Sequence, residues 1–376
     1  MTEADPPGST PAWPPIERPT TEAPASGPPA VDRPPVDGLH AGDVATPPGM
    51  VEIVSAGLDL NLRLSREVRQ LSLYVGLLFL AAIGPVAAIA VARSIRDGGF
   101  DWLIDILSAA FDGTPIDLST PLTIAFLLGA ACFVAISVDV QLLATGLLGA
   151  GVGHRHLEIR EAIALARRGF WRLIVASIAV GLILIIPRQV LGAAIRDSTE
   201  AGALLGAAFD VLLSMPFAYV GAAVVLGRAG PIEAVRQSWG MAGRRWRLAL
   251  VIGIVNTAVS YLSGFAIGAG LDILIRIATA LGIDQGLGPL QSLELIAIVG
   301  FAIVALGSLT LTIATLSVAP QVVAWVRLGG SLAGIPRDDP GGLGPGPGRA
   351  SLVSVPMTAA IVVATIAAAA EIVGPR

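Results

Sequence analysis

The sequence predicts an all-α membrane protein: a polytopic bundle of six to seven transmembrane helices with amphipathic helices at the membrane surface and an internal duplication. Of its 376 residues, 54% are hydrophobic and only 14% are charged, whereas charged residues make up about a quarter of a soluble domain. The mean hydropathy is +0.77. Apolar runs long enough to cross roughly 30 Å of hydrocarbon recur along the chain, and arginines gather in alternate segments between them.

Residues 1–49 are rich in Pro, Ala, Gly, Thr and acidic residues. Such a segment cannot bury enough apolar surface to offset the entropy of ordering, so we expect a disordered cytoplasmic tail. It lacks the charged start, apolar centre and small-residue cleavage site of a signal peptide. We expect the first apolar span to act as the insertion signal for a helical membrane domain over residues 50–330.

Residues 50–70 predict an amphipathic helix at the membrane surface, because leucines and valines at helical spacing lie opposite Arg63, Arg66 and Arg69. The apolar runs that follow predict six spans, near 71–92, 121–150, 172–194, 203–227, 248–271 and 293–326. The second and the sixth of these exceed the minimum length, so we expect a break or a tilt there, with Pro320 as the place for a break. A Gly/Pro-rich linker over 331–350 leads to residues 351–376, where the alanine-rich run 351–373 predicts a seventh span.

The placement of the arginines predicts the orientation, because loops that stay in the cytoplasm retain positive charge. Arg63, Arg66 and Arg69 precede the first span, and arginines outnumber acidic residues in 154–172 and 228–247, whereas acidic residues balance or outnumber arginines in the alternate loops. We therefore predict a multi-pass plasma-membrane protein with a cytoplasmic N-terminus.

The stretch GPIEAVRQSWGMAGRRWRLAL, residues 230–250, predicts a second surface helix. Gly230 and Pro231 suit a helix start. Ile232, Val235, Trp239, Ala242 and Trp246 form one apolar face, and the arginines occupy the other. Residues 157–180 repeat this pattern, and Phe170-Trp171-Arg172-Leu173 matches Arg245-Trp246-Arg247-Leu248. The repetition indicates an internal duplication.

The motif Gly230-Pro231-Ile232-Glu233-Ala234, with Arg236-Gln237-Ser238-Trp239 and Arg245-Trp246-Arg247-Leu248, resembles the membrane-domain family of glycerophosphoryl diester phosphodiesterases. The resemblance covers about residues 120–330. It implies a multi-span membrane domain that in some members is fused to a soluble catalytic barrel. The earlier copy of the motif lacks both the Gly-Pro and the Ser-Trp pair.

The composition argues against catalysis and nucleic-acid binding. A metal-dependent phosphodiesterase needs carboxylates and histidines that converge on hard cations, but the three histidines are His40, in the N-terminal tail, and His154 and His156, in one loop. We expect no enzyme activity, no cofactor and no metal site. The net charge of −4 and the absence of a Walker A motif leave no support for nucleic-acid or nucleotide binding.

Two carboxylates, Asp139 and Asp210, lie within predicted spans. A charge there is costly and commonly faces the bundle interior or a water-filled cavity. Two interpretations remain open. The pair, with Asn256 nearby, forms an intramembrane polar site, or each carboxylate is neutral and hydrogen-bonded within the bundle.

The sequence predicts a non-enzymatic membrane protein whose arginine-rich cytoplasmic helices contact anionic lipid headgroups or another membrane protein. The candidate contact residues are Arg167, Arg168, Trp171, Arg172, Arg236, Trp239, Arg244, Arg245, Trp246 and Arg247. The alternative is a transporter or permease of a small solute or ion that uses Asp139 and Asp210.

Overall fold

The computed structural model describes residues 49–97, 102, 120–155, 157–195, 200–282, 289–335 and 354–373. These residues form an all-α bundle, and no strand occurs among them. Six described helices are long and apolar enough to cross a membrane, which makes the chain a multi-pass membrane protein. The predicted disordered tail lies outside the described residues.

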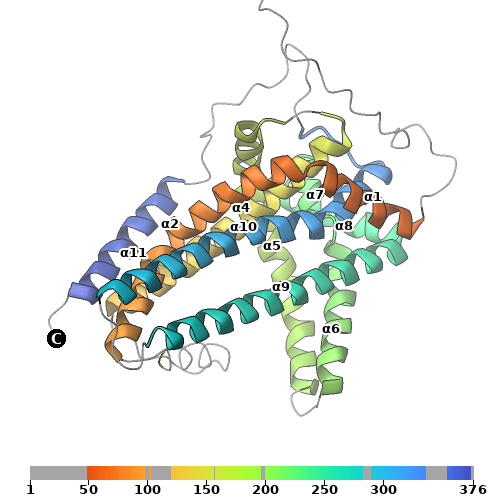
Figure 1. Ribbon diagram of the computed structural model, residues 1–376. Helices are drawn as coiled ribbons and strands as arrows, with labels where there is room; N and C mark the ends of the chain where they lie inside the picture. Colours follow the sequence, from red (N-terminus) through yellow and green to blue (C-terminus); the bar gives the residue numbers. More distant parts are fainter. Residues whose placement is uncertain are drawn as a thin grey trace, which may run out of the picture. The chain divides into compact units, whose positions relative to one another are not determined.

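The helices run back and forth between two ends of the bundle (Figure 1). In chain order they are α1 (Met50–Arg63), α2 (Ser65–Asp97), α4 (Thr120–Val152), α5 (Ile159–Ile195), α6 (Glu200–Ser214), the 3₁₀ turn η1 (Met215–Phe217), α7 (Val220–Val225), α8 (Pro231–Arg244), α9 (Trp246–Ala280), α10 (Pro289–Arg327) and α11 (Val355–Val373).

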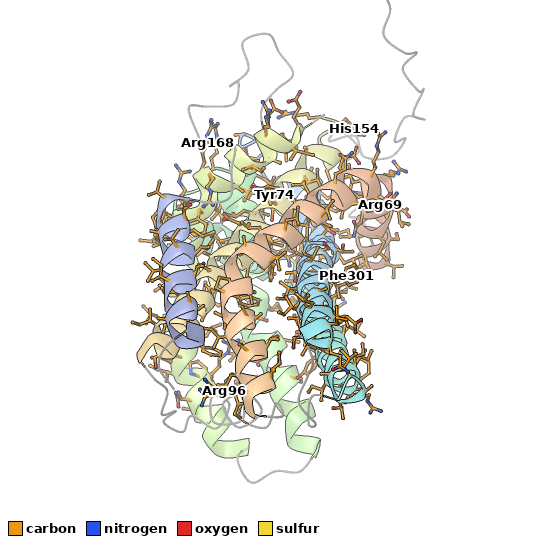
Figure 2. All side chains as sticks on the ribbon, turned by 60° about the vertical axis from the view of Figure 1, so that its left-hand side comes forward. Arg69, Tyr74, Arg96, His154, Arg168 and Phe301 are labelled. Atoms are coloured by element: carbon orange, nitrogen blue, oxygen red, sulfur yellow. The ribbon has the colours of Figure 1, made fainter. Side chains whose placement is uncertain are left out.

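Arginines mark one end of the bundle, which we call the arginine-rich end. Arg69, His154 and Arg168 lie together there, and Arg96 lies at the opposite end (Figure 2). The short helices α1 and α8, the start of α5 and the last turns of α4, α7 and α10 belong to this end, because hydrogen bonds and ion pairs join them. The segments at this end are the alternate inter-span segments in which the sequence concentrates its arginines.

The packed core lies toward the arginine-rich end, where α4, α7 and α10 meet. Leu142, Leu148, Leu226 and Trp325 are fully buried there. Apolar side chains nearer the opposite end, such as Leu182, Phe265 and Phe301, are exposed. In a membrane these side chains contact acyl chains, so a lipid environment replaces protein packing over that half of the bundle.

Two glycines allow α2 and α10 to pack closely. A Cβ atom at Gly307 would lie 2.8 Å from the Cα atom of Gly76, and a Cβ atom at Gly76 would meet the carbonyl oxygen of Val304. A side chain at either position would collide with the facing helix, so glycine is required for α2 and α10 to pack this closely.

The seventh apolar segment forms α11, which runs beside α2 and α4 (Figure 1). Near its start, Met357 joins the main core. Near its end, Ala367 and Ala368 pack with Ile89 and Ala125, which lie at the far ends of α2 and α4. The helix has 19 residues and therefore extends for about 28 Å.

Several boundaries differ from the sequence predictions. The predicted surface helix 50–70 is interrupted at Leu64, and the long helix α2 begins at Ser65. Pro320 does not break α10, which is continuous over 39 residues. Residues 331–335 of the predicted linker pack against the bundle, because Gly334 donates its backbone N–H to the carbonyl oxygen of Leu226.

The helix starts at the arginine-rich end form three copies of one motif, not two. In each copy, the carbonyl oxygen of a cap residue accepts the first helical hydrogen bond: Gly49 from Ile53, Glu158 from Ala162, and Gly230 from Ala234. Counting from these caps aligns the glutamates Glu52, Glu161 and Glu233, the buried small residues Gly57, Ala166 and Ser238, and the arginines Arg63, Arg172 and Arg244. The duplication seen in the sequence therefore has a third member at α1.

This register changes one correspondence inferred from the sequence. Arg172 aligns with Arg244 and not with Arg247, because α8 ends at Arg244 and one non-helical residue, Arg245, precedes α9. The same segment of α5 continues into its span without a break.

Each of the three copies packs on a different span. The start of α5 packs on α4, α8 packs on η1 and α7, and α1 packs on α10. The first copy therefore rests on the last span of the six. Gly57 makes this last contact possible, because a Cβ atom there would lie 3.0 Å from the nitrogen of Pro320.

Candidate membrane-surface site

The outward face of α8 combines apolar and basic side chains. Ile232 is 81% exposed, Trp239 is 55% exposed, and Trp246, at the start of α9, is 53% exposed. Arg236 and Arg244 are exposed beside them. An apolar stripe that the protein itself leaves uncovered, flanked by arginines, is the pattern of a helix in the headgroup layer.

The predicted apolar face of α8 is divided between protein and surroundings. Its large members, Ile232 and Trp239, point outward, whereas Ala242 is buried. The face that packs on the bundle consists of Ala234, Ser238 and Ala242, one turn apart. The small inward residues bring α8 close to the bundle, and the bulky ones remain available for lipid.

Ser238 connects α8 to a break in the fourth span. The hydroxyl of Ser238 donates a hydrogen bond to the carbonyl oxygen of Pro216 at 2.8 Å and accepts one from the backbone N–H of Tyr219 at 3.0 Å. Both backbone groups belong to the interruption between α6 and α7, where the regular helical partners are missing. Ser238 is itself fully buried, so one side chain satisfies the buried N–H of Tyr219 and the part-buried carbonyl of Pro216.

Trp239 contacts the same break. Its ring lies 5.7 Å from the ring of Phe217 in an edge-to-face arrangement, which is a favourable aromatic geometry. Ser238 and Trp239, the Ser-Trp pair of the sequence motif, therefore hold α8 against this break through two hydrogen bonds and an aromatic contact.

The basic residues of the second copy separate into two groups. Arg168, Trp171 and Arg172 are exposed, and Trp171 has 69% of its surface accessible. The guanidinium of Arg172 donates a hydrogen bond to the carbonyl oxygen of Arg228 at 3.3 Å. The fourth candidate of this copy, Arg167, is directed into the bundle.

Arg167 forms an ion pair with Asp139 inside the bundle. The Nη2 atom of Arg167 lies 3.2 Å from Oδ2 of Asp139, and the two side chains are 16% and 0% exposed. The Arg167 guanidinium also lies 5.5 Å from the ring centroid of Phe170. A buried carboxylate thus has a nearby cation, which offsets part of its desolvation.

Asp210 and Asn256 lie apart from that ion pair. Asp210 pairs with Arg188 at 3.0 Å, and both side chains are more than half exposed. Asn256 is exposed on α9. Because Arg167 and Arg188 are 21 positions apart on α5, the two ion pairs are separated by roughly 30 Å along that helix. The structure does not bring Asp139, Asp210 and Asn256 together into one site.

The remaining arginines of the third copy are exposed. Arg244, Arg245 and Arg247 follow one another around the junction of α8 and α9. The guanidinium of Arg247 lies 5.5 Å from the ring centroid of Trp246. Arg236 forms an ion pair with Glu233 at 2.6 Å. Among the residues that the structure describes, no carboxylate forms an ion pair with Arg244, Arg245 or Arg247, so the junction presents several positive charges beside a tryptophan.

An ion pair outside the spans fastens α1 to α10. Arg327 donates a hydrogen bond to Glu52 at 2.7 Å. This hydrogen bond and the positive charge of Arg327 hold the pKa of Glu52 below its usual value. Because the folded-state pKa is lowered, this contact stabilises the fold at neutral pH and its contribution is lost as the pH falls through that lowered pKa.

The described part of the chain offers these residues no metal cluster, and a cavity that it contains between α2 and α10 is apolar. No group of three His, Cys, Asp or Glu side chains is arranged to hold a metal ion there. A cavity of about 90 Å³ between α2 and α10 has an apolar lining that includes Leu80, Val91, Ile296 and Ile303. That cavity offers no charged group to a polar solute.

Sequence reasoning missed three features of this end. Arg167 lies on the apolar stripe of Ile163, Ala166 and Phe170, a position that signals an inward direction. The copy at α1 has a signal in the equal spacing from Gly49 to Arg63 and from Gly230 to Arg244. The double hydrogen bond of Ser238 has none, because it depends on how α8 meets a segment some twenty residues away.

Comparison of the chain with known proteins found no matching family model, no matching curated protein and no matching solved structure.

Proposed function

We propose that this chain is a non-catalytic protein of the plasma membrane whose arginine-rich end lies in the cytoplasm and binds the anionic headgroups of the inner leaflet. The single observation that carries the proposal is the outward face of α8 and its junction with α9. There Ile232, Trp239 and Trp246 are exposed beside Arg236, Arg244 and Arg247.

The physical argument rests on complementarity with the membrane interface. Tryptophan concentrates at the headgroup level because its ring is apolar and its N–H is polar. Each basic residue near an anionic leaflet contributes about 1 kcal/mol of attraction. The surface helices continue directly into spans, so these side chains lie at the level of the headgroups.

The orientation rests on the same residues. Arginines concentrate at the end that carries α1, α8 and the start of α5, and the positive-inside rule assigns that end to the cytoplasm. The likeness of residues 230–248 to the membrane-domain family of glycerophosphoryl diester phosphodiesterases agrees with a membrane role without chemistry of its own. The assignment of the chain to that family is part of the proposal.

A transport function for Asp139 and Asp210 is the alternative. It receives less support, because the two carboxylates pair with different arginines of α5. The break in the fourth span, a feature that some transporters use to bind ions, has its open backbone groups occupied by Ser238.

Native mass spectrometry of the purified full-length protein tests the lipid proposal. With equal amounts of phosphatidylglycerol and phosphatidylcholine offered in detergent, the wild-type chain should retain phosphatidylglycerol preferentially. A variant with Arg236→Gln, Arg244→Gln and Arg247→Gln should lose most of that preference.

The matched control replaces two arginines of the opposite end, Arg188→Gln and Arg276→Gln, and should keep the preference. Equal retention of the two lipids by the wild-type protein would contradict the proposal.

A further inference from the structure

We infer that the chain carries three equivalent sites for anionic phospholipid headgroups, one in each copy of the repeated motif, centred on Arg63, Arg172 and Arg244. The inference rests on the proposed function and adds the number, the position and the equivalence of the sites. It includes the α1–α2 junction, which lies outside the stretch that carries the proposed function.

The first argument is register. Each arginine stands at the same spacing from the cap residue that accepts the first helical hydrogen bond of its copy. Each copy packs on one span: α1 on α10, the start of α5 on α4, and α8 on η1 and α7 of the interrupted fourth span. Equal spacing places the three guanidinium groups about four helical turns from their helix starts, at the ends of α1 and α8 and at the corresponding point of the continuous helix α5.

The second argument is exposure and charge. All three arginines are exposed, and among the residues that the structure describes none of them forms an ion pair with a carboxylate. The glutamates of the motif are engaged elsewhere: Glu52 and Glu161 accept hydrogen bonds from the backbone of their own caps, and Glu233 pairs with Arg236. Arg172 donates a hydrogen bond to the carbonyl oxygen of Arg228, but this neutral acceptor does not cancel its charge, so all three positive charges remain for an external anion.

The third argument is the apolar side chain beside each arginine. Leu62 precedes Arg63 and is 73% exposed, Trp171 precedes Arg172, and Trp246 follows Arg244 by two positions. A guanidinium next to an exposed apolar group matches an amphiphile with a phosphate head and an acyl tail. Inorganic phosphate offers only the first of these two features, so the pattern favours a phospholipid.

Three sites on one chain affect the strength of membrane binding. When one site binds a headgroup, the other two sites are held close to the same leaflet, so the attachment is multivalent. The three sites would also place three anionic lipids around the protein at once.

The test counts bound phosphatidylglycerol on the full-length protein by native mass spectrometry at increasing lipid concentration. Wild-type protein should show three tightly held phosphatidylglycerol molecules. Each single variant, Arg63→Gln, Arg172→Gln or Arg244→Gln, should retain two and should bind the third about fivefold more weakly, the effect of one basic residue near a headgroup. Arg160→Gln, an exposed arginine of α5 at another register, is the matched control and should retain three.

Two further arms separate the possible causes. The triple variant Arg63→Lys/Arg172→Lys/Arg244→Lys preserves the charges and should retain three lipids, whereas a merely structural role of arginine would show as a loss. Inorganic phosphate added in excess should not displace phosphatidylglycerol, and full displacement would identify free phosphate as the ligand and overturn the lipid assignment.

The two proposals fail in different ways. If only Arg244→Gln reduces the count, the proposed function stands and the threefold inference is overturned. If the wild-type protein does not distinguish phosphatidylglycerol from phosphatidylcholine, both are overturned.

Discussion

Ser238 satisfies two backbone groups that the break in the fourth span leaves open. Ser238→Ala should destabilise the protein by about 1–3 kcal/mol, because the buried Tyr219 N–H and the part-buried Pro216 carbonyl would lose their partner. Unfolding in mixed detergent micelles measures this difference.

Ser260→Ala is the matched control for that substitution. Ser260 is exposed and bonds only a carbonyl oxygen of its own helix, so its loss should change stability by less than about 0.5 kcal/mol. Equal effects of the two substitutions would show that the Ser238 bridge contributes nothing.

The buried ion pair gives a second prediction at the scale of single residues. Asp139→Asn should cost about 3–5 kcal/mol, because it leaves the charge of Arg167 largely buried without its counterion. The double variant Asp139→Leu/Arg167→Leu should recover most of that loss, since paired apolar replacements of a buried ion pair are commonly near neutral. The measurement is the same unfolding equilibrium.

Asp210→Asn provides the comparison for that pair. Asp210 and its partner Arg188 are both more than half exposed and do not lie in the packed core, so the loss of this pair should cost less than the loss of the buried pair. A double variant at 139 and 167 that is less stable than Asp139→Asn would contradict the argument.

The spans and the breaks within them differ in how well the sequence predicts them. The spans could be predicted because length and apolar content alone decide whether a helix can cross a membrane. Breaks could be predicted only in part, since Pro216 and Pro320 both stand in apolar runs and are both candidate breaks, yet only Pro216 coincides with an interruption. The difference lies in the facing helix: a serine hydroxyl meets the backbone at Pro216, whereas Gly57 only makes room beside Pro320.

The candidate site was predictable in part for a similar reason. Arginines and tryptophans of α8 and α5 stand out by composition, and most of them are exposed. The inward turn of Arg167 is a tertiary property, because its partner Asp139 belongs to the preceding span.

The contact of α1 with α10 supports a prediction about helix packing. Gly57→Ala should destabilise the protein by about 1–3 kcal/mol, because the added Cβ atom would lie 3.0 Å from the Pro320 nitrogen and must push the two helices apart. Thermal unfolding monitored by circular dichroism checks this.

Gly240→Ala is the matched control in the equivalent helix α8. No atom lies within 4 Å of a Cβ atom at Gly240, so alanine should stabilise that helix by about 0.5–1 kcal/mol through its higher propensity. Substitutions that change stability in the same direction would contradict the packing argument.

At the scale of the whole molecule, α11 determines where the C-terminus lies. Because this helix starts beside the main core and ends beside the far ends of α2 and α4, the chain should cross the membrane a seventh time. A cysteine introduced by Arg376→Cys should react with a membrane-impermeant maleimide in intact cells, whereas Arg245→Cys should react only after permeabilisation. Protection of both cysteines in intact cells would contradict a seventh span.

The packing of α1 on α10 also bears on the order in which the protein is made. α1 is synthesised before α10, but Pro320 and Arg327, which α1 contacts, belong to α10. Until α10 has been inserted, Gly57 and Glu52 of α1 lack these two contacts. The final packing of α1 therefore waits for the synthesis and insertion of residues 320–327, and a chain stalled before residue 320 leaves this part of α1 uncovered.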